Sequence, residues 1–211
     1  MINAIIFDFD GVLADSEHIN IEAGVRVFGE IGHELNGEER KYIAGKHSKD
    51  TVPYIIKSRG INIEEEVIVQ RFQQLYNELW ESDVLAMPAI KEALHALKKK
   101  GIVLAIATNN RKARVDIFID RFGLDDIFSI IIGNEDITKR KPDPEVYLKA
   151  IEKLGLPSEV IIAVEDSAVG LQAAKAAGLR CAVIPNQYTI DHDFLSADFV
   201  LKSAHDLLGL I

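Results

Sequence analysis

Short runs of apolar residues recur along the chain and alternate with segments that have the apolar spacing of helices. Unbroken apolar runs of this length are typical of strands that are buried on both faces. Strands that alternate with helices in this way predict an α/β fold with a doubly wound, Rossmann-like parallel sheet. The expected strands are residues 4–7, 102–107, 129–132, 160–164, 181–184 and 199–201.

Proline and glycine residues mark the limits of several expected helices. Proline is favoured at the start of a helix, and glycine is favoured just after its end. Three helices with such limits are expected at residues 89–100, 145–154 and 169–177, bounded by Pro88, Gly101, Pro144, Gly155 and Gly178. The sequence therefore predicts βα units that are joined by short links.

One long segment, from about residue 15 to residue 83, breaks this alternation because it has helical spacing and no convincing strand. We therefore expect two domains, an α/β core of residues 1–15 and 84–211 and a helical cap of residues 16–83. Ligands of open α/β sheets bind beyond the carboxyl ends of the strands. Since the insert follows the first strand, it is expected to act as a lid over such a site.

Composition narrows the class of protein. The 211 residues are 48% apolar, which is enough for a sizeable core. The net charge is −9, with 33 acidic and 24 basic residues, so a nucleic acid partner is not expected. Neither a basic leader nor a run of the roughly 18 apolar residues of a membrane span is found, which predicts a cytoplasmic protein. A monomer or a small homo-oligomer is expected. Cys181 lies in an apolar run and is expected to be a buried strand residue.

Pairs of carboxylates follow two of the expected strands. Asp8 and Asp10 come directly after the first strand, and Glu165 and Asp166 follow the strand of residues 160–164. Two carboxylates at the end of a buried strand repel each other unless a cation or a shared proton relieves the repulsion. The alternative is that the aspartates only cap a turn or a helix.

Polar and cationic side chains follow other strand ends. Thr108 and Asn109 come after the strand of residues 102–107 and offer donors for an oxyanion, although they also suit an ordinary helix cap. Lys141 belongs to a cationic cluster just before an expected helix, which could instead be a solvated charge run. All of these groups are expected at one edge of the sheet.

These residues form four ordered motifs that closely resemble those of the haloacid dehalogenase superfamily. The resemblance points to the branch that contains phosphoglycolate phosphatase-like enzymes and β-phosphoglucomutase, and it covers nearly the whole chain. Each motif alone is a weak pattern, so the specificity lies in the ordered set. The motifs are residues 8–16 (DFDGVLADS), 107–109 (ATN), 141–144 (KPDP) and 165–167 (EDS), the last with Gly170.

The resemblance implies a division of roles. Asp8 would be the nucleophile that forms an aspartyl-phosphate, and Asp10 would be the general acid and base. Phosphate oxygens would be bound by Thr108 and Asn109, with Lys141 neutralising their charge. The cofactor would be Mg²⁺, which offsets the repulsion between a carboxylate and a phosphate. Its implied ligands are Asp8, the backbone carbonyl of Asp10, Glu165 and Asp166.

The cap would supply substrate contacts, for which Asn20, Lys46, His47 and Lys49 are candidates, although the last three also suit a solvated surface. β-Phosphoglucomutase carries a histidine where this chain has Asn20 and a phosphate-gripping arginine near the position of Ser48. These departures favour a phosphatase that hydrolyses a small phosphorylated metabolite, with a sugar phosphate favoured. Ala89 also replaces a glycine that the family usually carries at the return from the cap.

Four alternatives are retained or weighed against this reading. The main alternative is a phosphosugar mutase, in which Lys46 or Lys49 replaces the missing groups. Phosphonate cleavage would need a cap lysine as well, and an inactive binding protein would be expected to lack one of the core residues. Dehalogenation is disfavoured because dehalogenases of the superfamily lack the carboxylate that corresponds to Asp10.

Overall fold

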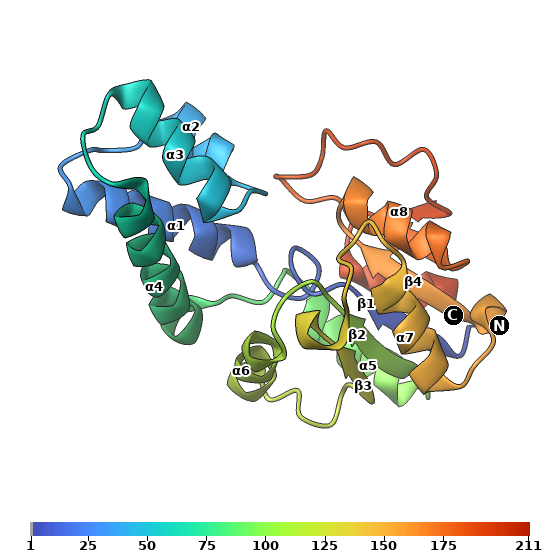
Figure 1. The fold of residues 1–211 in the computed structure, drawn as a ribbon. Helices are drawn as coiled ribbons and strands as arrows, with labels where there is room; N and C mark the ends of the chain where they lie inside the picture. The colour runs from blue at the N-terminus through green and yellow to red at the C-terminus, as the bar shows by residue number, and fades with distance from the viewer. Residues whose placement is uncertain (1) are drawn as a thin grey trace. The chain divides into compact units, whose positions relative to one another are not determined.

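The structure, a computed structural model, describes residues 2–211, which form two compact units (Figure 1). One unit contains the residues up to Ala14 together with Ala86–Ile211, and the other is Asp15–Leu85. The core was expected to end at residue 15 and to resume at residue 84. Asp15 instead groups with the helical unit because its side chain accepts a hydrogen bond from the backbone N–H of His18 and so caps the first helix.

The first unit is built on a parallel sheet of six strands in the order β3-β2-β1-β4-β5-β6. The strands are β1 (Ala4–Phe7), β2 (Val103–Ala107), β3 (Ile130–Ile132), β4 (Ile161–Glu165), β5 (Arg180–Val183) and β6 (Phe199–Val200). The chain passes from β1 to β2 and β3 on one side and then returns to β4 on the other side of β1. This reversal next to β1 is the switch point at which doubly wound sheets bind ligands.

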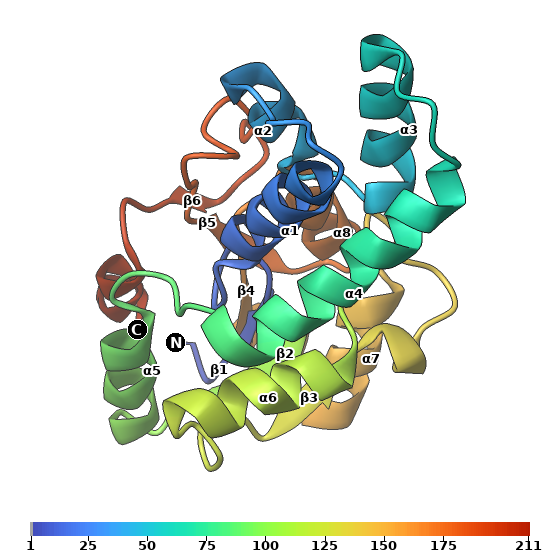
Figure 2. The same cartoon turned by 90° about the vertical axis from the view of Figure 1, so that its left-hand side faces the viewer.

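Helices cover both faces of this sheet. Figure 2 shows α5 (Ile90–Lys99) and α6 (Lys112–Phe122) on one side, with α7 (Glu145–Leu154) and α8 (Ala168–Ala176) on the other. Short 3₁₀ helices complete the unit at Asn134–Asp136, Ser158–Val160 and Ala204–Leu210. The predicted α/β class with a doubly wound parallel sheet is confirmed.

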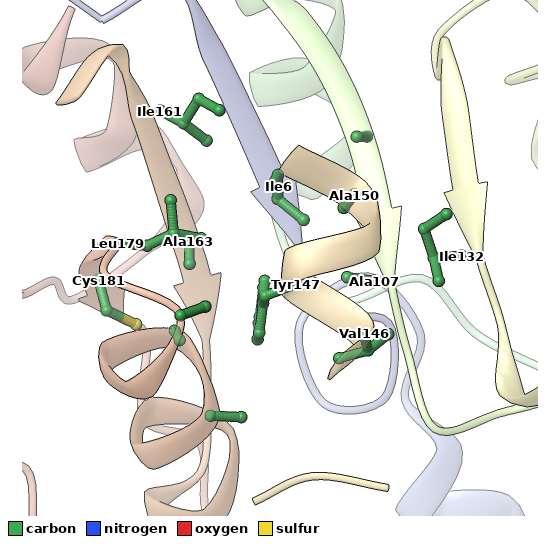
Figure 3. Packing of buried hydrophobic residues seen from close by; sticks show 14 of the residues in the cluster. Ile6, Ala107, Ile132, Val146, Tyr147, Ala150, Ile161, Ala163, Leu179 and Cys181 are labelled. Carbon is green, nitrogen blue, oxygen red and sulfur yellow. The ribbon is translucent and has the colours of Figure 1, made fainter. Parts of the chain in front are cut away.

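Burial of the sheet on both faces explains why its strands are continuous apolar runs in the sequence. Each residue of β1 is fully buried, because alternate side chains point to opposite faces and both faces are covered by helices. On one face Ile6 and Ala163 pack with Tyr147 and Ala150 of α7 (Figure 3). Cys181 belongs to the same cluster and is fully buried, as expected, and burial raises the pKa of its thiol.

The expected helix of residues 89–100 begins one residue later than predicted. Ala89 has a φ of 61°, in the left-handed region that glycine adopts without steric penalty, and the helix starts at Ile90. The turn therefore has the backbone conformation of a glycine but carries a Cβ atom.

The second unit consists of four helices: α1 (Ser16–Glu30), α2 (Gly37–Ile43), α3 (Ser48–Arg59) and α4 (Glu65–Asp83). The long helices α1 and α4 pack side by side, and buried apolar residues such as Ile19, Phe28 and Phe72 fill the space between the helices. Asn36 begins α2 with a reciprocal capping box to Glu39. No helix within residues 2–211 combines the length and the apolar character that crossing a membrane requires.

Candidate active site

The acidic residues meet where two neighbouring strands end. β1 pairs with β4, with Phe7 opposite Val164, so Asp8 emerges beside Glu165 and Asp166. Ligand oxygens from these three carboxylates all lie within 4.8 Å of one another. The structure therefore brings together, from distant parts of the sequence, three acidic groups that are almost completely buried.

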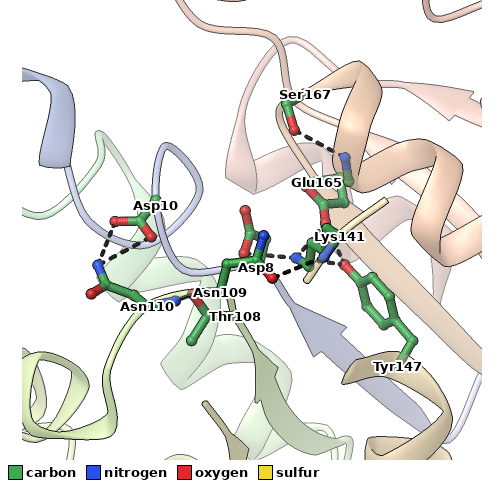
Figure 4. A network of polar contacts seen from close by, with 10 residues as sticks. Asp8, Asp10, Thr108, Asn109, Asn110, Lys141, Tyr147, Glu165 and Ser167 are labelled. Carbon is green, nitrogen blue, oxygen red and sulfur yellow. Dashed lines mark hydrogen bonds and ion pairs between the residues drawn. The ribbon is translucent and has the colours of Figure 1, made fainter. Parts of the chain in front are cut away.

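A single buried lysine balances part of this charge. Lys141 Nζ lies 2.8 Å from Asp8 Oδ1 and 2.6 Å from Glu165 Oε1 (Figure 4). Its backbone N–H donates to Asn109 Oδ1 at 3.0 Å, which fixes the loop that carries it. Burial alone would lower the pKa of the Lys141 ammonium, but the charges of Asp8 and Glu165 outweigh burial and hold the pKa above its ordinary value.

Glu165 is the most enclosed member of the cluster. Its Oε1 accepts hydrogen bonds from Lys141 Nζ and from the hydroxyl of Tyr147, at 2.6 Å each. Its Oε2 is buried without a hydrogen-bond partner. Burial, reinforced by the charge of Asp8, raises the pKa of Glu165 to about 7. Gly170 leaves room for this carboxylate, because a Cβ atom there would lie 1.9 Å from Glu165 Oε2.

Asp166 is held by a residue from a distant loop. Asn186 Nδ2 donates to Asp166 Oδ2 at 2.8 Å and to the carbonyl oxygen of Gly11 at 3.3 Å. Gly11 has a φ of 74°, and a Cβ atom there would lie 2.2 Å from Asp166 Oδ2. Burial, together with the charges of Asp8 and Glu165, raises the pKa of Asp166 well above its ordinary value. A cation would relieve this repulsion.

The donor set fits a hard divalent cation. Among residues 2–211, three buried carboxylates face only one ammonium group, that of Lys141, so ionising all three would leave an excess of negative charge in a dry site. The unpartnered Glu165 Oε2 is an oxygen that a cation could satisfy. Carboxylate oxygens are the ligands that Mg²⁺ and Ca²⁺ prefer.

Asp10 is held by the loop that follows β2. Its carboxylate accepts from Asn110 Nδ2, at 2.9 Å to Oδ1 and 3.2 Å to Oδ2 (Figure 4). Thr108 is fully buried, and its Oγ1 accepts from the backbone N–H of Asn110 at 2.9 Å. Through Asn109 and Asn110, the loop after β2 thus contacts both the lysine loop and the loop after β1.

The cap candidates gather within the helical unit: Lys46 and His47 lie on the loop between α2 and α3, Lys49 lies in the first turn of α3, and Asn20 lies on α1. Asn20 Nδ2 donates to the carbonyl oxygens of Ile43 and Lys46, at 3.0 and 3.2 Å. Lys46 Nζ lies 3.6 Å above the ring of Tyr42, while His47 caps the start of α3. Lys46, His47 and Lys49 are exposed in the structure. The amide nitrogen of Asn20 therefore binds the backbone of this loop.

Three residues of the site were not singled out from the sequence. Tyr147 lies on the buried face of α7, and a phenolic hydroxyl on a buried helix face needs a polar partner, so this signal was available. Asn110 was noted only as one member of a polar run after the second strand. Asn186 lies in an irregular link, and nothing in the sequence indicates that it contacts Asp166.

Comparison with known proteins agrees with the fold. Residues 5–184 match the haloacid dehalogenase-like hydrolase family. The chain is 30% identical, over 84% of its length and 82% of the relative's, to a phosphorylated carbohydrates phosphatase from Thermotoga maritima. The structure of a proposed β-phosphoglucomutase from the same organism superposes with a TM-score of 0.85 and 28% identity, covering 99% of this chain and 98% of that one.

A further solved structure that resembles this chain includes a bound compound. A variant of CbbY from Rhodobacter sphaeroides, crystallised with xylulose-(1,5)bisphosphate, superposes with a TM-score of 0.78 and 30% identity over 98% of this chain and 96% of that one. The family match spans most of the sheet, all four motifs and the acidic cluster. This chain belongs to the haloacid dehalogenase-like hydrolase family.

Proposed function

We propose that this chain is a Mg²⁺-dependent phosphatase that hydrolyses a small phosphorylated metabolite, most favourably a sugar phosphate, through an aspartyl-phosphate on Asp8. The observation that carries the proposal is the buried contact of Asp8 with Lys141 beside Glu165 and Asp166. The phosphorylated carbohydrates phosphatase and the CbbY complex with a sugar bisphosphate support the substrate class.

In the proposed reaction Asp8 attacks phosphorus in line and the bond to the leaving oxygen breaks. Asp10 gives its proton to that oxygen, so the alcohol leaves neutral and Asp8 carries the phosphoryl group. Asp10, now ionised, then takes a proton from the water that attacks the phosphorus. The acyl-phosphate bond breaks, and inorganic phosphate and the free Asp8 carboxylate are released.

The basic and amide groups around Asp8 would hold the phosphoryl oxygens. Lys141 already carries its charge beside Asp8, where negative charge increases as the phosphoryl group arrives. Asn109 accepts from the Lys141 backbone N–H through its amide oxygen, which leaves its amide nitrogen to donate to a phosphate oxygen. Thr108, fixed at the end of β2, is proposed as a second donor.

The metal would be held by carboxylates of Asp8 and Asp166, by the backbone carbonyl of Asp10, and by Glu165 directly or through water. Bound there, Mg²⁺ supplies positive charge that offsets the repulsion between the Asp8 carboxylate and the phosphate. The fit of the donor set supports this assignment, since these carboxylates are buried with too little positive charge around them.

Substrate choice is assigned to the helical unit. Lys46, His47 and Lys49 are proposed as contacts because they are exposed around the start of α3, and Asn20 contributes by fixing the backbone of the loop that leads into this helix. A mutase remains the second candidate, favoured by the likeness to the β-phosphoglucomutase structure. In that case the phosphoryl group on Asp8 would return to a second hydroxyl of a sugar phosphate rather than pass to water.

The proposal is tested by measuring phosphate release from a panel of phosphorylated metabolites, with saturating Mg²⁺ and with EDTA. We expect release from one or a few sugar phosphates, loss of release in EDTA, and a phosphoryl group that can be trapped on the wild-type chain. An Asp8→Asn protein should fold and show neither release nor trapped phosphate. Wild-type turnover in this variant would refute the role of Asp8.

The same panel separates the two candidates. β-Glucose 1-phosphate is supplied with a trace of the 1,6-bisphosphate, and glucose 6-phosphate is followed with a coupled enzyme. Glucose 6-phosphate that appears without matching free phosphate would establish the mutase reaction. If the wild-type protein forms no product from any compound of the panel, with or without Mg²⁺, both the phosphatase and the mutase proposals are contradicted.

A further inference from the structure

The loops that follow β1 and β2 are joined by a contact that the proposed reaction does not yet use. The two strands pair in parallel with Phe7 opposite Ile106, so Asp10 and Asn110 leave the sheet side by side. One nitrogen, Asn110 Nδ2, lies within hydrogen-bond distance of both Asp10 oxygens, at 2.9 and 3.2 Å (Figure 4). The amide therefore restrains the whole carboxylate of Asp10.

The orientation of the Asn110 amide is itself determined by its neighbours. Its Oδ1 accepts from the backbone N–H of Arg111 at 2.8 Å and from Arg114 Nη1 at 3.1 Å. A flipped amide would place Oδ1 against the carboxylate of Asp10 and the amino group against two donors. The contacts thus hold the amino group of Asn110 toward Asp10.

The backbone of Asn110 is fixed as well. Its N–H donates to Thr108 Oγ1 at 2.9 Å, and the carbonyl oxygen of Asn110 accepts from the backbone N–H of Asn134. A side chain that donates to Asp10 is therefore mounted on a loop anchored at several points. Such anchoring is what a precisely held acid or base requires from its surroundings.

We propose that Asn110 is a positioning residue for Asp10, and this inference rests on the acid and base role of Asp10 in the proposed function. An aspartate side chain that rotates freely would spend only part of its time aimed at the leaving oxygen. Restraint by Asn110 lowers the entropic cost of aligning the Asp10 carboxyl group with the leaving oxygen, because the side chain is already oriented before the reaction begins. Asn110 acts through Asp10 and is not assigned a contact with substrate.

This role predicts a dependence on the leaving group. A sugar alkoxide is a strong base and needs a proton as it departs, whereas p-nitrophenolate is a weak base and leaves without one. The readout is kcat/KM, because it reports the steps up to departure of the leaving group and excludes the later hydrolysis that both substrates share. The substrates are p-nitrophenyl phosphate and whichever sugar phosphate of the panel is turned over fastest.

For Asn110→Ala we expect kcat/KM to fall about 10-fold for the sugar phosphate and by no more than about 2-fold for p-nitrophenyl phosphate. Asp10→Asn should show the same preference with a larger loss. Asn110→Asp keeps the shape of the side chain but replaces the donor with a charged acceptor, and it should show the preference too. Changes in phosphate binding cancel in the ratio of the two substrates.

Asn3→Ala is the matched control, because Asn3 is exposed just before β1, and it should leave both values unchanged. Equal losses on both substrates in Asn110→Ala would indicate a structural role only, and an unchanged or increased rate would mean that Asn110 does not aid Asp10. Either result overturns the inference if Asp10→Asn keeps its leaving-group preference. Absence of that preference in Asp10→Asn would instead overturn the proposed role of Asp10, and the inference with it.

Discussion

Replacing Lys141 with methionine would remove the only ammonium group that contacts the acidic cluster of the described residues, while most of the side-chain volume is kept. Lys141 Nζ lies 2.8 Å from Asp8 Oδ1 and 2.6 Å from Glu165 Oε1, and its side chain is 4% exposed. Removal of one partner from a buried ion pair costs about 3–5 kcal/mol, because the other charge stays buried without compensation. That is a large share of the roughly 5–15 kcal/mol by which a domain is stable.

The loss of stability in Lys141→Met should depend on pH, because Glu165 changes its charge with pH. Its pKa is raised from 4.5 to about 7 in the folded protein, so the folded state binds this proton more tightly than the unfolded state. Ionisation of Glu165 therefore lowers the stability of the folded protein as the pH rises through this range. Without Lys141 the pKa of Glu165 rises further. Compared with the wild type, Lys141→Met should therefore lose most stability at a pH above the folded pKa of Glu165 and least at acidic pH, where Glu165 is protonated.

The assay is urea unfolding followed by circular dichroism in EDTA, at about pH 5 and about pH 8. The control is Lys139→Met, the same substitution at a side chain that is 73% exposed two residues away. Adding Mg²⁺ should restore part of the lost stability. In a Lys141→Met, Glu165→Gln double variant, loss of both charges should recover part of it too. If Lys141→Met and Lys139→Met unfold at the same urea concentration at the higher pH, the reasoning is wrong.

Three further predictions concern the stability of the fold. Gly170→Ala should lower the unfolding free energy by about 1–3 kcal/mol, because the new Cβ atom would meet the Glu165 carboxylate. Gly29→Ala, in open space on α1, should raise it by about 0.5–1 kcal/mol, and urea unfolding of both variants checks the pair. Tyr147→Phe removes a buried donor to Glu165 and should cost about 1–3 kcal/mol in urea unfolding. Ala89→Gly should stabilise by about 1 kcal/mol because φ is 61° there, and an unchanged or lower melting temperature would contradict this.

Much of the architecture follows from local patterns. Runs buried on both faces had to be apolar throughout, so β1 and β4 stand out in the sequence, as does the helical segment between the first two strands. Element ends were less certain. β4 extends to Glu165, although a charged residue marks the end of an apolar run, because its backbone continues the pairing with β5. The left-handed Ala89 could not be read from its residue type.

The sequence by itself determined which chemical groups the chain carries and at which strand ends, because motif spacing and apolar periodicity are local properties. Only the tertiary structure decided which of these groups touch. Lys141 contacts Asp8 across 133 positions and Asn110 contacts Asp10 across 100, since strand order and register bring separate loops to one edge of the sheet. Burial was decided there too, because the pKa of Glu165 depends on the helix and the lysine packed around it.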